Sequence, residues 1–201
     1  MELYDRLTAK FPANHFSTST TQTVIEEEDP NALTRIVTFE HMGTEVLKID
    51  KTLFVAVRDE KLVPSSATTT LSEVCDGAIA TEESSRFIGY VELKSKCSQN
   101  EVIKARGQII ASHHHMLAIA QSCAFSLSDF VQKGIIITQP VTDETLTKAR
   151  QRRKRDDNLK VTFSSARFLL KLIEGEAKDE ATGICFVHAT ATGAVHLKEI
   201  L

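Results

Sequence analysis

Residues 72–96 read SEVCDGAIATEESSRFIGYVELKSK, and this stretch decides the fold that we expect. Its first half is an apolar run that contains one acid, Asp76. A polar turn over residues 81–85 follows, and β-forming residues then recur over residues 86–95. The stretch therefore predicts two strands joined by a turn, with a carboxylate inside the first strand.

The second strand of this hairpin ends in Val91-Glu92-Leu93-Lys94. Successive side chains of a strand point to opposite faces, so Glu92 and Lys94 share one face, roughly 7 Å apart at about 3.3 Å of rise per residue. Val91 and Leu93 take the other face. If the hairpin pairs, Asp76 lies beside Glu92, and two carboxylates and one ammonium group then form a single patch.

The composition is typical of a globular chain, with 42% apolar and 25% charged residues among 201. This length suits one α/β domain, which we expect to have a mixed central sheet flanked by helices. We expect no signal peptide, no membrane span and no bulk-charge binding of nucleic acid at a net charge of −3. An intracellular, reduced protein, cytoplasmic or nuclear, is predicted because no CxxC pair occurs among the four cysteines, Cys75, Cys97, Cys123 and Cys185.

Local patterns predict the other elements. Helices are expected over residues 1–10, from about Gln99 to about Ser122, from Thr142 or Asp143 onward, and over 161–173. Strands are expected in an antiparallel set between Thr34 and Arg58 that ends in a buried strand, Leu53–Val57, and over 134–138 and 183–190. Less regular segments are a loop or edge over 15–24, a solvated acidic turn over 26–30, and a loop over 59–70.

The helix near residue 99 opens with Ser98-Gln99-Asn100-Glu101, which matches a capping box. Arg106 and His113 fall in the middle of its apolar stripe, so they are either satisfied in the core or face a site. Gln108 lies off that stripe. It is nearer to Glu101 and Ser112.

The order of Asp76, a Glu-x-Lys strand end, a capped helix and a further strand resembles the PD-(D/E)XK nuclease superfamily. The resemblance covers roughly residues 50–140 and implies the restriction-endonuclease-like αβββαβ core, with additions at both ends of a single domain, 1–201. Gln108, fourteen residues after Lys94, resembles the helix glutamine of the RecB and lambda-exonuclease branch.

The resemblance implies metal-dependent hydrolysis of phosphodiester bonds in DNA or RNA. Mg²⁺ prefers oxygen ligands and keeps several waters, so one or two carboxylates are enough to hold it. Asp76 and Glu92 would ligate Mg²⁺ or Mn²⁺, with the Leu93 backbone carbonyl as a candidate third ligand. Lys94 would orient the attacking water, help to deprotonate it, or offset charge growing on phosphorus. Gln108 would orient Lys94 or the substrate.

The chain departs from the family pattern at three points. Cys75 stands where the family name has proline, and Ser112 stands where the RecB branch has tyrosine, four residues after its glutamine. The third departure leaves a second metal open, because several upstream acids fit equally well: Glu26, Glu27, Glu28 and Glu45.

Two further runs of residues have functional and structural interpretations. Consecutive helical residues point about 100° apart, so His113-His114-His115 cannot close on one metal ion, and we expect one inward and two surface histidines.

A basic run ends the helix that begins near Thr142, and it is either a phosphate contact, an import-like signal or a solvated helix end. The candidate nucleic-acid contacts are Arg106, Arg150, Arg152, Arg153, Lys154 and Arg155.

Two alternatives remain at this stage. The first is a catalytically silent module of the same fold that binds nucleic acid or a protein partner. The second is a cap-snatching-type endonuclease, which would need an upstream histidine in the pocket, and His41 is available. Because the 201-residue chain shows no recognition domain, we also expect a homodimer or a partner protein.

Overall fold

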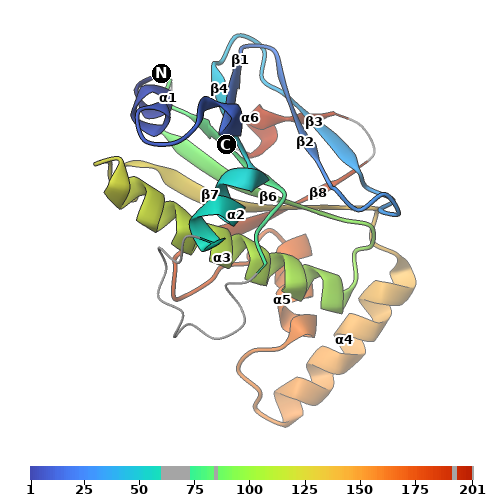
Figure 1. Cartoon of the computed structure of the whole chain (residues 1–201). Helices are drawn as coiled ribbons and strands as arrows, with labels where there is room; N and C mark the ends of the chain where they lie inside the picture. Colours follow the sequence, from blue (N-terminus) through green and yellow to red (C-terminus); the bar gives the residue numbers. More distant parts are fainter. Residues whose placement is uncertain (60–72, 84–85, 192–193, 201) are drawn as a thin grey trace.

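The protein is a mixed α/β structure built on a six-stranded mixed sheet flanked by helices (Figure 1). A computed structural model describes residues 1–59, 73–83, 86–191 and 194–200. The six strands lie in the order β1 (Phe16–Ser19), β4 (Val46–Asp50), β5 (Gly77–Thr81), β6 (Phe87–Lys94), β7 (Val131–Thr138) and β8 (Cys185–Thr190). A smaller sheet contains β2 (Gln22–Glu26), β3 (Ile36–Glu40) and β9 (Val195–His196).

The predicted hairpin is confirmed, and it forms the centre of the large sheet. Strands β5 and β6 are antiparallel, while β6, β7 and β8 are parallel to one another. Asp76 precedes β5 rather than lying inside it, but its N–H still donates to the Val91 carbonyl at 3.0 Å. The polar turn is described only as far as residue 83, so its end at residues 84–85 lies outside the described residues.

Most helices cover one face of the large sheet, and the small sheet covers the other together with the short C-terminal helix (Figure 1). Ile88 and Tyr90 belong to the core on the helical side, whereas Val91 and Leu93 pack toward the small sheet, which confirms the predicted alternation along β6. The helices are α1 (Glu2–Thr8), α2 (Lys51–Asp59), α3 (Gln99–Ser122), α4 (Asp143–Asn158), α5 (Ser165–Ile173) and α6 (Leu197–Ile200). Short 3-10 helices cover Ala13–His15 and Leu127–Asp129. No described helix is long and apolar enough to cross a membrane.

The predicted strand Leu53–Val57 is wrong, because these residues belong to helix α2. Asp50 begins the helix by accepting hydrogen bonds from the Thr52 N–H at 3.0 Å and from the Thr52 hydroxyl at 2.8 Å. Leu53, Phe54 and Val57 are buried, which is the spacing of a helical stripe. A short apolar run does not separate a buried strand from a buried helix by itself, so the local signal was ambiguous.

The segments outside the core differ from prediction in smaller ways. Residues 15–24 form the edge strand β1 and most of β2, so only the edge alternative holds. The helix expected over 161–173 begins later, where the Ser164 hydroxyl accepts the Arg167 N–H at 3.3 Å. No local pattern indicated β9 or α6. The predicted loop 59–70 lies outside the described residues except for Asp59.

Helix α3 has the predicted bounds, and the Ser98 hydroxyl caps it by accepting the Glu101 N–H at 3.3 Å. The expectation of one inward histidine is wrong, because both His113 and His115 are buried. His113 Nδ1 lies 2.9 Å from the Gln132 side-chain oxygen, so this buried histidine has a neutral hydrogen-bond partner. Helix α3 is contacted by the sheet, by α2 and by α5, so it is covered on more than one side and residues two apart can both be buried.

Candidate active site

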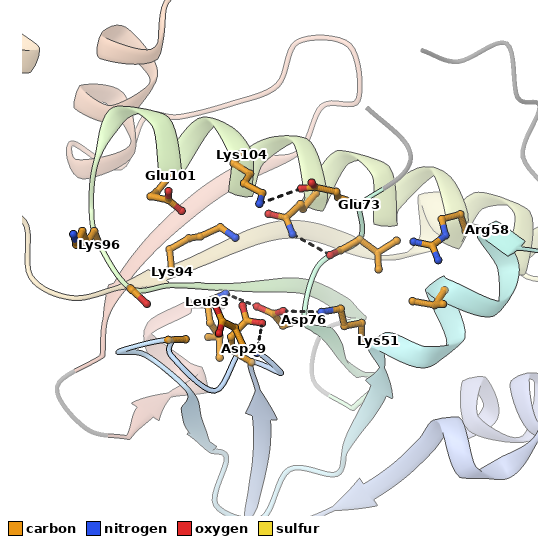
Figure 2. Close-up of a pocket in the computed structure, with 16 residues that line it drawn as sticks. Asp29, Lys51, Arg58, Glu73, Asp76, Leu93, Lys94, Lys96, Glu101 and Lys104 are labelled. Atoms are coloured by element: carbon orange, nitrogen blue, oxygen red, sulfur yellow. Dashed lines mark hydrogen bonds and ion pairs between the residues drawn. The ribbon is translucent and has the colours of Figure 1, made fainter. Parts of the chain in front are cut away.

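A cavity of about 590 Å³ opens beside the end of β6, between helix α3, the start of α2 and the loop after β2 (Figure 2). Four of the residues predicted for catalysis or metal binding line it or its floor: Asp76, Leu93, Lys94 and Gln108. The rest of the wall is strongly charged, with Glu27, Asp29, Lys51, Arg58, Glu73, Lys96, Glu101 and Lys104.

Three carboxylates converge at the floor of this cavity. The β5–β6 register pairs Gly77 with Val91, so Asp76, one residue earlier, comes opposite Glu92. Glu27 approaches from the loop after β2, and one ligand oxygen from each of Glu27, Asp76 and Glu92 lies within 4.8 Å of the others. The predicted placement of Asp76 beside Glu92 is therefore confirmed. Of the four candidate upstream acids, Glu27 is the one that lies next to them.

Glu92 and Lys94 form a buried hydrogen-bonded pair on the face of β6 that points toward α3. The Glu92 side chain has no exposed surface, and its Oε1 accepts a hydrogen bond from the Lys94 ammonium. Its other oxygen, Oε2, is buried with no hydrogen-bond partner among the described residues. A buried, unpartnered carboxylate oxygen costs free energy, so this atom is suited to a proton or a cation.

Two side chains of helix α3 hydrogen-bond to the backbone immediately before Asp76. The Gln108 side-chain amide donates to the Val74 carbonyl at 3.2 Å, and the Ser112 hydroxyl accepts the Cys75 N–H at 2.9 Å. Gln108 and Ser112 are one helical turn apart, and both bond the single peptide group that joins Val74 to Cys75, just before Asp76. The serine that departs from the RecB-type pattern thus has a structural role. No hydrogen bond joins Gln108 to Lys94 in the described part of the chain; its contact is with Val74.

Asp76 itself is fixed by the strand next to it. Its Oδ2 accepts the Leu93 N–H at 2.8 Å, while its Oδ1 lies 3.5 Å from the Lys51 ammonium. Figure 2 shows both contacts meeting at Asp76 on the cavity floor. The Leu93 N–H is committed to this bond, and a ligand role for the Leu93 carbonyl stays a prediction.

The ionisable groups perturb one another strongly. Burial raises the pKa of Glu92 to about 8, and the nearby Asp76 adds to that rise. Burial also raises the pKa of Asp76 to about 6, against the opposing effect of the Leu93 N–H. Burial lowers the pKa of Lys94, but the Glu92 carboxylate raises it more, so the net pKa of Lys94 is above its ordinary value. Lys94 is therefore an ammonium at neutral pH.

The sequence did not indicate Lys51 as a site residue, and it did not separate Glu27 from the other upstream acids. Residues 51–57 were predicted as a turn and a strand, whereas Lys51 is the first residue of α2. The β4–β5 register pairs Asp50 with Gly77, so the next residue, Lys51, comes opposite Asp76. Glu27 is the half-buried member of an otherwise exposed acidic turn, and no local pattern distinguishes it from its neighbours.

Other predicted residues lie away from this cavity. The Arg106 guanidinium pairs with Asp179 and stacks over the Phe163 ring at 4.8 Å, so α3 is tied to the segment after α5. Asp179 compensates the charge of Arg106, although Arg106 Nε is buried without a hydrogen-bond partner among the described residues. His113 is bonded to Gln132 in the core. His41 is buried and engaged by the Thr23 hydroxyl at 2.9 Å, and it does not line the cavity.

The predicted basic run lies on α4, which projects from the body of the protein (Figure 1). Only Ala149 and Asp156 of this helix are buried. The basic residues of the run are all exposed: Arg150, Arg152, Arg153, Lys154 and Arg155.

Comparisons of this chain with protein-family models, with curated proteins and with solved structures find no match.

Proposed function

We propose that this protein is a metal-dependent nuclease that hydrolyses phosphodiester bonds of DNA or RNA. One observation carries the proposal: Glu27, Asp76 and Glu92 converge within 4.8 Å beside the buried Lys94 ammonium. The order β4, β5, β6, α3, β7 supports it, because these elements follow the βββαβ part of the implied αβββαβ core, with α2 inserted between β4 and β5.

The residues present fit a hard divalent cation. The donor set is entirely carboxylate oxygen, which is the ligand type that Mg²⁺ and Mn²⁺ take. Glu92 Oε2 is buried and lacks a hydrogen-bond partner in the described chain, so it is available as a ligand. Glu27, Asp76 and Glu92 would hold the ion, which when bound would polarise the phosphate and neutralise part of its charge.

Lys94 acts in this proposal as a charged donor. Its pKa is raised, so the ammonium keeps its protons and cannot serve as the base in this state. It orients the attacking water and offsets charge developing on the phosphate oxygens. The water oxygen bonds to phosphorus while one phosphorus–ester oxygen bond breaks, one water proton ends on the leaving oxygen, and the other stays with the new phosphate or passes to solvent.

Helix α4 supplies the surface along which a long substrate would bind. Arg150, Arg152, Lys154 and Arg155 make no ion pair within the described part of the chain. The helix begins just after β7, whose last residue, Thr138, pairs with Lys94. At about 1.5 Å per residue, the run from Arg150 to Arg155 lies roughly 10–18 Å along α4 from its start at Asp143. A negatively charged backbone that passes through the cavity would therefore reach it.

Cleavage of labelled oligonucleotides tests the proposal. Single-stranded and double-stranded DNA and RNA are incubated with the purified protein in Mg²⁺, in Mn²⁺ and in EDTA. We expect cleavage of at least one substrate with metal and none with EDTA. Lys94→Ala should fold, because Glu92 can keep a proton once its partner is removed, and it should cleave at least about 100-fold more slowly.

Two variants sharpen this experiment. Glu92→Ala should abolish cleavage, whereas Lys198→Ala, an exposed lysine of α6 on the opposite side of the sheet, should cleave at the parent rate. Cleavage by Lys94→Ala at the parent rate would overturn the assignment. No metal-dependent cleavage of any substrate would instead favour a silent module that binds nucleic acid or a protein partner. The cap-snatching alternative lacks its histidine, since none of the described residues lining the cavity is a histidine.

A further inference from the structure

Lys51 lies at one end of a row of charged residues that crosses three strands. The strand registers place Lys51 opposite Asp76, and Asp76 opposite Glu92. Lys94, two residues further along β6, pairs with Glu92. One ammonium group therefore contacts Asp76 and the other contacts Glu92, and both lysines line the cavity (Figure 2).

The contacts of Lys51 are those of a loosely held cation. Its ammonium lies 3.5 Å from Asp76 Oδ1 and 3.4 Å from Glu28 Oε2, and the Lys51 side chain is 21% exposed. Glu28 is 72% exposed, so solvent screens its attraction. The Lys51 ammonium is therefore held mainly by Asp76, at a distance that a small shift of its flexible side chain would break.

Asp76 does not depend on Lys51 for its position. Its other carboxylate oxygen accepts the Leu93 N–H at 2.8 Å, and its own N–H donates to the Val91 carbonyl at 3.0 Å. Gln108 and Ser112 hold both polar groups of the Val74–Cys75 peptide, which precedes Asp76. Removing the Lys51 charge would thus leave the carboxylate in place, which argues against a purely structural role for this lysine.

The formal charges of the site indicate a role for Lys51 in binding the substrate phosphate. With the carboxylates of Glu27, Asp76 and Glu92 ionised and both lysines charged, these five groups sum to −1. A divalent cation brings the sum to +1, which one phosphodiester, at −1, neutralises. Without Lys51, the metal-loaded group would be neutral and would attract the phosphate less strongly.

We propose that Lys51 is a second cation of the catalytic site, which neutralises Asp76 in the free protein and contacts the substrate phosphate once a metal ion occupies the carboxylates. This inference rests on the proposed nuclease function. In this proposal Lys51 competes with the metal ion for Asp76 and also binds the substrate phosphate. Removing Lys51 should therefore strengthen metal binding and weaken substrate binding. Removing a lysine that merely supported Asp76 would weaken both metal and substrate binding.

The test compares the parent with Lys51→Met, Lys51→Arg and Lys48→Met. Lys48 is a matched control, because it lies three residues earlier on β4 and does not line the cavity. Mn²⁺ binding is measured by isothermal titration calorimetry without substrate. We expect Lys51→Met to bind Mn²⁺ about tenfold more tightly, because a positive charge next to the ion has been removed. Lys51→Arg and Lys48→Met should stay within about twofold of the parent.

The second measurement uses the oligonucleotide that the parent protein binds best, with Ca²⁺ present in place of Mg²⁺. We expect Lys51→Met to bind it at least about tenfold more weakly and to cleave it about 100-fold more slowly with Mg²⁺, with Lys51→Arg recovering most of the binding. Tighter Mn²⁺ binding together with weaker oligonucleotide binding supports the proposal. Weaker Mn²⁺ binding, or unchanged oligonucleotide binding, overturns it.

Failure of the nuclease function would be visible separately. If the parent binds oligonucleotide but cleaves none, the proposed hydrolysis fails while the two binding measurements still decide the role of Lys51. If the parent binds no oligonucleotide under any of these conditions, both proposals are overturned. Circular dichroism melts of each variant establish that the proteins compared are folded.

Discussion

Metal binding by this site should depend steeply on pH, and Glu92 should be the reason. Burial raises the pKa of Glu92 to about 8, so most of this carboxyl is protonated at neutral pH in the metal-free protein. A cation binds the ionised carboxylate and must displace that proton. Affinity for Mn²⁺ should therefore rise as the pH rises, and Glu92→Gln, which has no ionisable group at this position, should remove most of the dependence.

The size of the effect follows from two pKa values. With a pKa of about 8, Glu92 is ionised to about 1% at pH 6, about 10% at pH 7 and about half at pH 8. Asp76, with a pKa of about 6, contributes a further factor of about two over the same range. The apparent affinity for Mn²⁺ should thus increase about 100-fold between pH 6 and pH 8, and binding at pH 7 should release about one proton.

Isothermal titration calorimetry at pH 6, 7 and 8 measures both quantities, because repeating the titration in buffers of different ionisation enthalpy counts the protons released. Glu92→Gln should bind weakly and change only about twofold across this range, through Asp76. Glu199→Gln, an exposed acid on α6, is the matched control and should follow the parent. A parent affinity independent of pH, or an equally steep slope in Glu92→Gln, would refute the reasoning.

Three further predictions concern stability and substrate binding. A carboxyl whose pKa is raised on folding stabilises the folded state at low pH, and this contribution is lost as the pH rises. The melting temperature in EDTA should therefore fall between about pH 5 and pH 8, and the fall should be smaller in Glu92→Gln. An equal fall in both proteins would contradict this prediction. Gly134→Ala would place a methyl group 2.6 Å from the Phe186 ring, so urea denaturation should show a loss of about 1–3 kcal/mol, and unchanged stability would show that the contact relaxes freely. Replacing Arg150 and Lys154 of α4 with Gln should reduce the slope of log affinity for an oligonucleotide against log salt by about 0.7–0.9 per cation, whereas an unchanged slope would remove α4 from the binding surface.

The sequence alone determined the centre of the sheet and most of the carboxylate–lysine cluster. Alternation along residues 86–95 is a local property, so it placed Glu92 and Lys94 on one face. The capping box at Ser98 likewise set the start of α3 without reference to the rest of the chain. A hairpin brings its two strands together through a short connection, which is why Asp76 could be placed beside Glu92.

Only the tertiary structure decided which distant residues complete the site. Glu27 and Lys51 lie far from Glu92 in sequence, and they reach Asp76 through a loop crossing and through pairing of β4 with β5. Local pattern also misassigned Leu53–Val57, because a short apolar run satisfies both helical and extended burial until its neighbours are known. The pKa of Glu92 is likewise a property of the assembled core, because desolvation arises from atoms that the sequence order does not bring together.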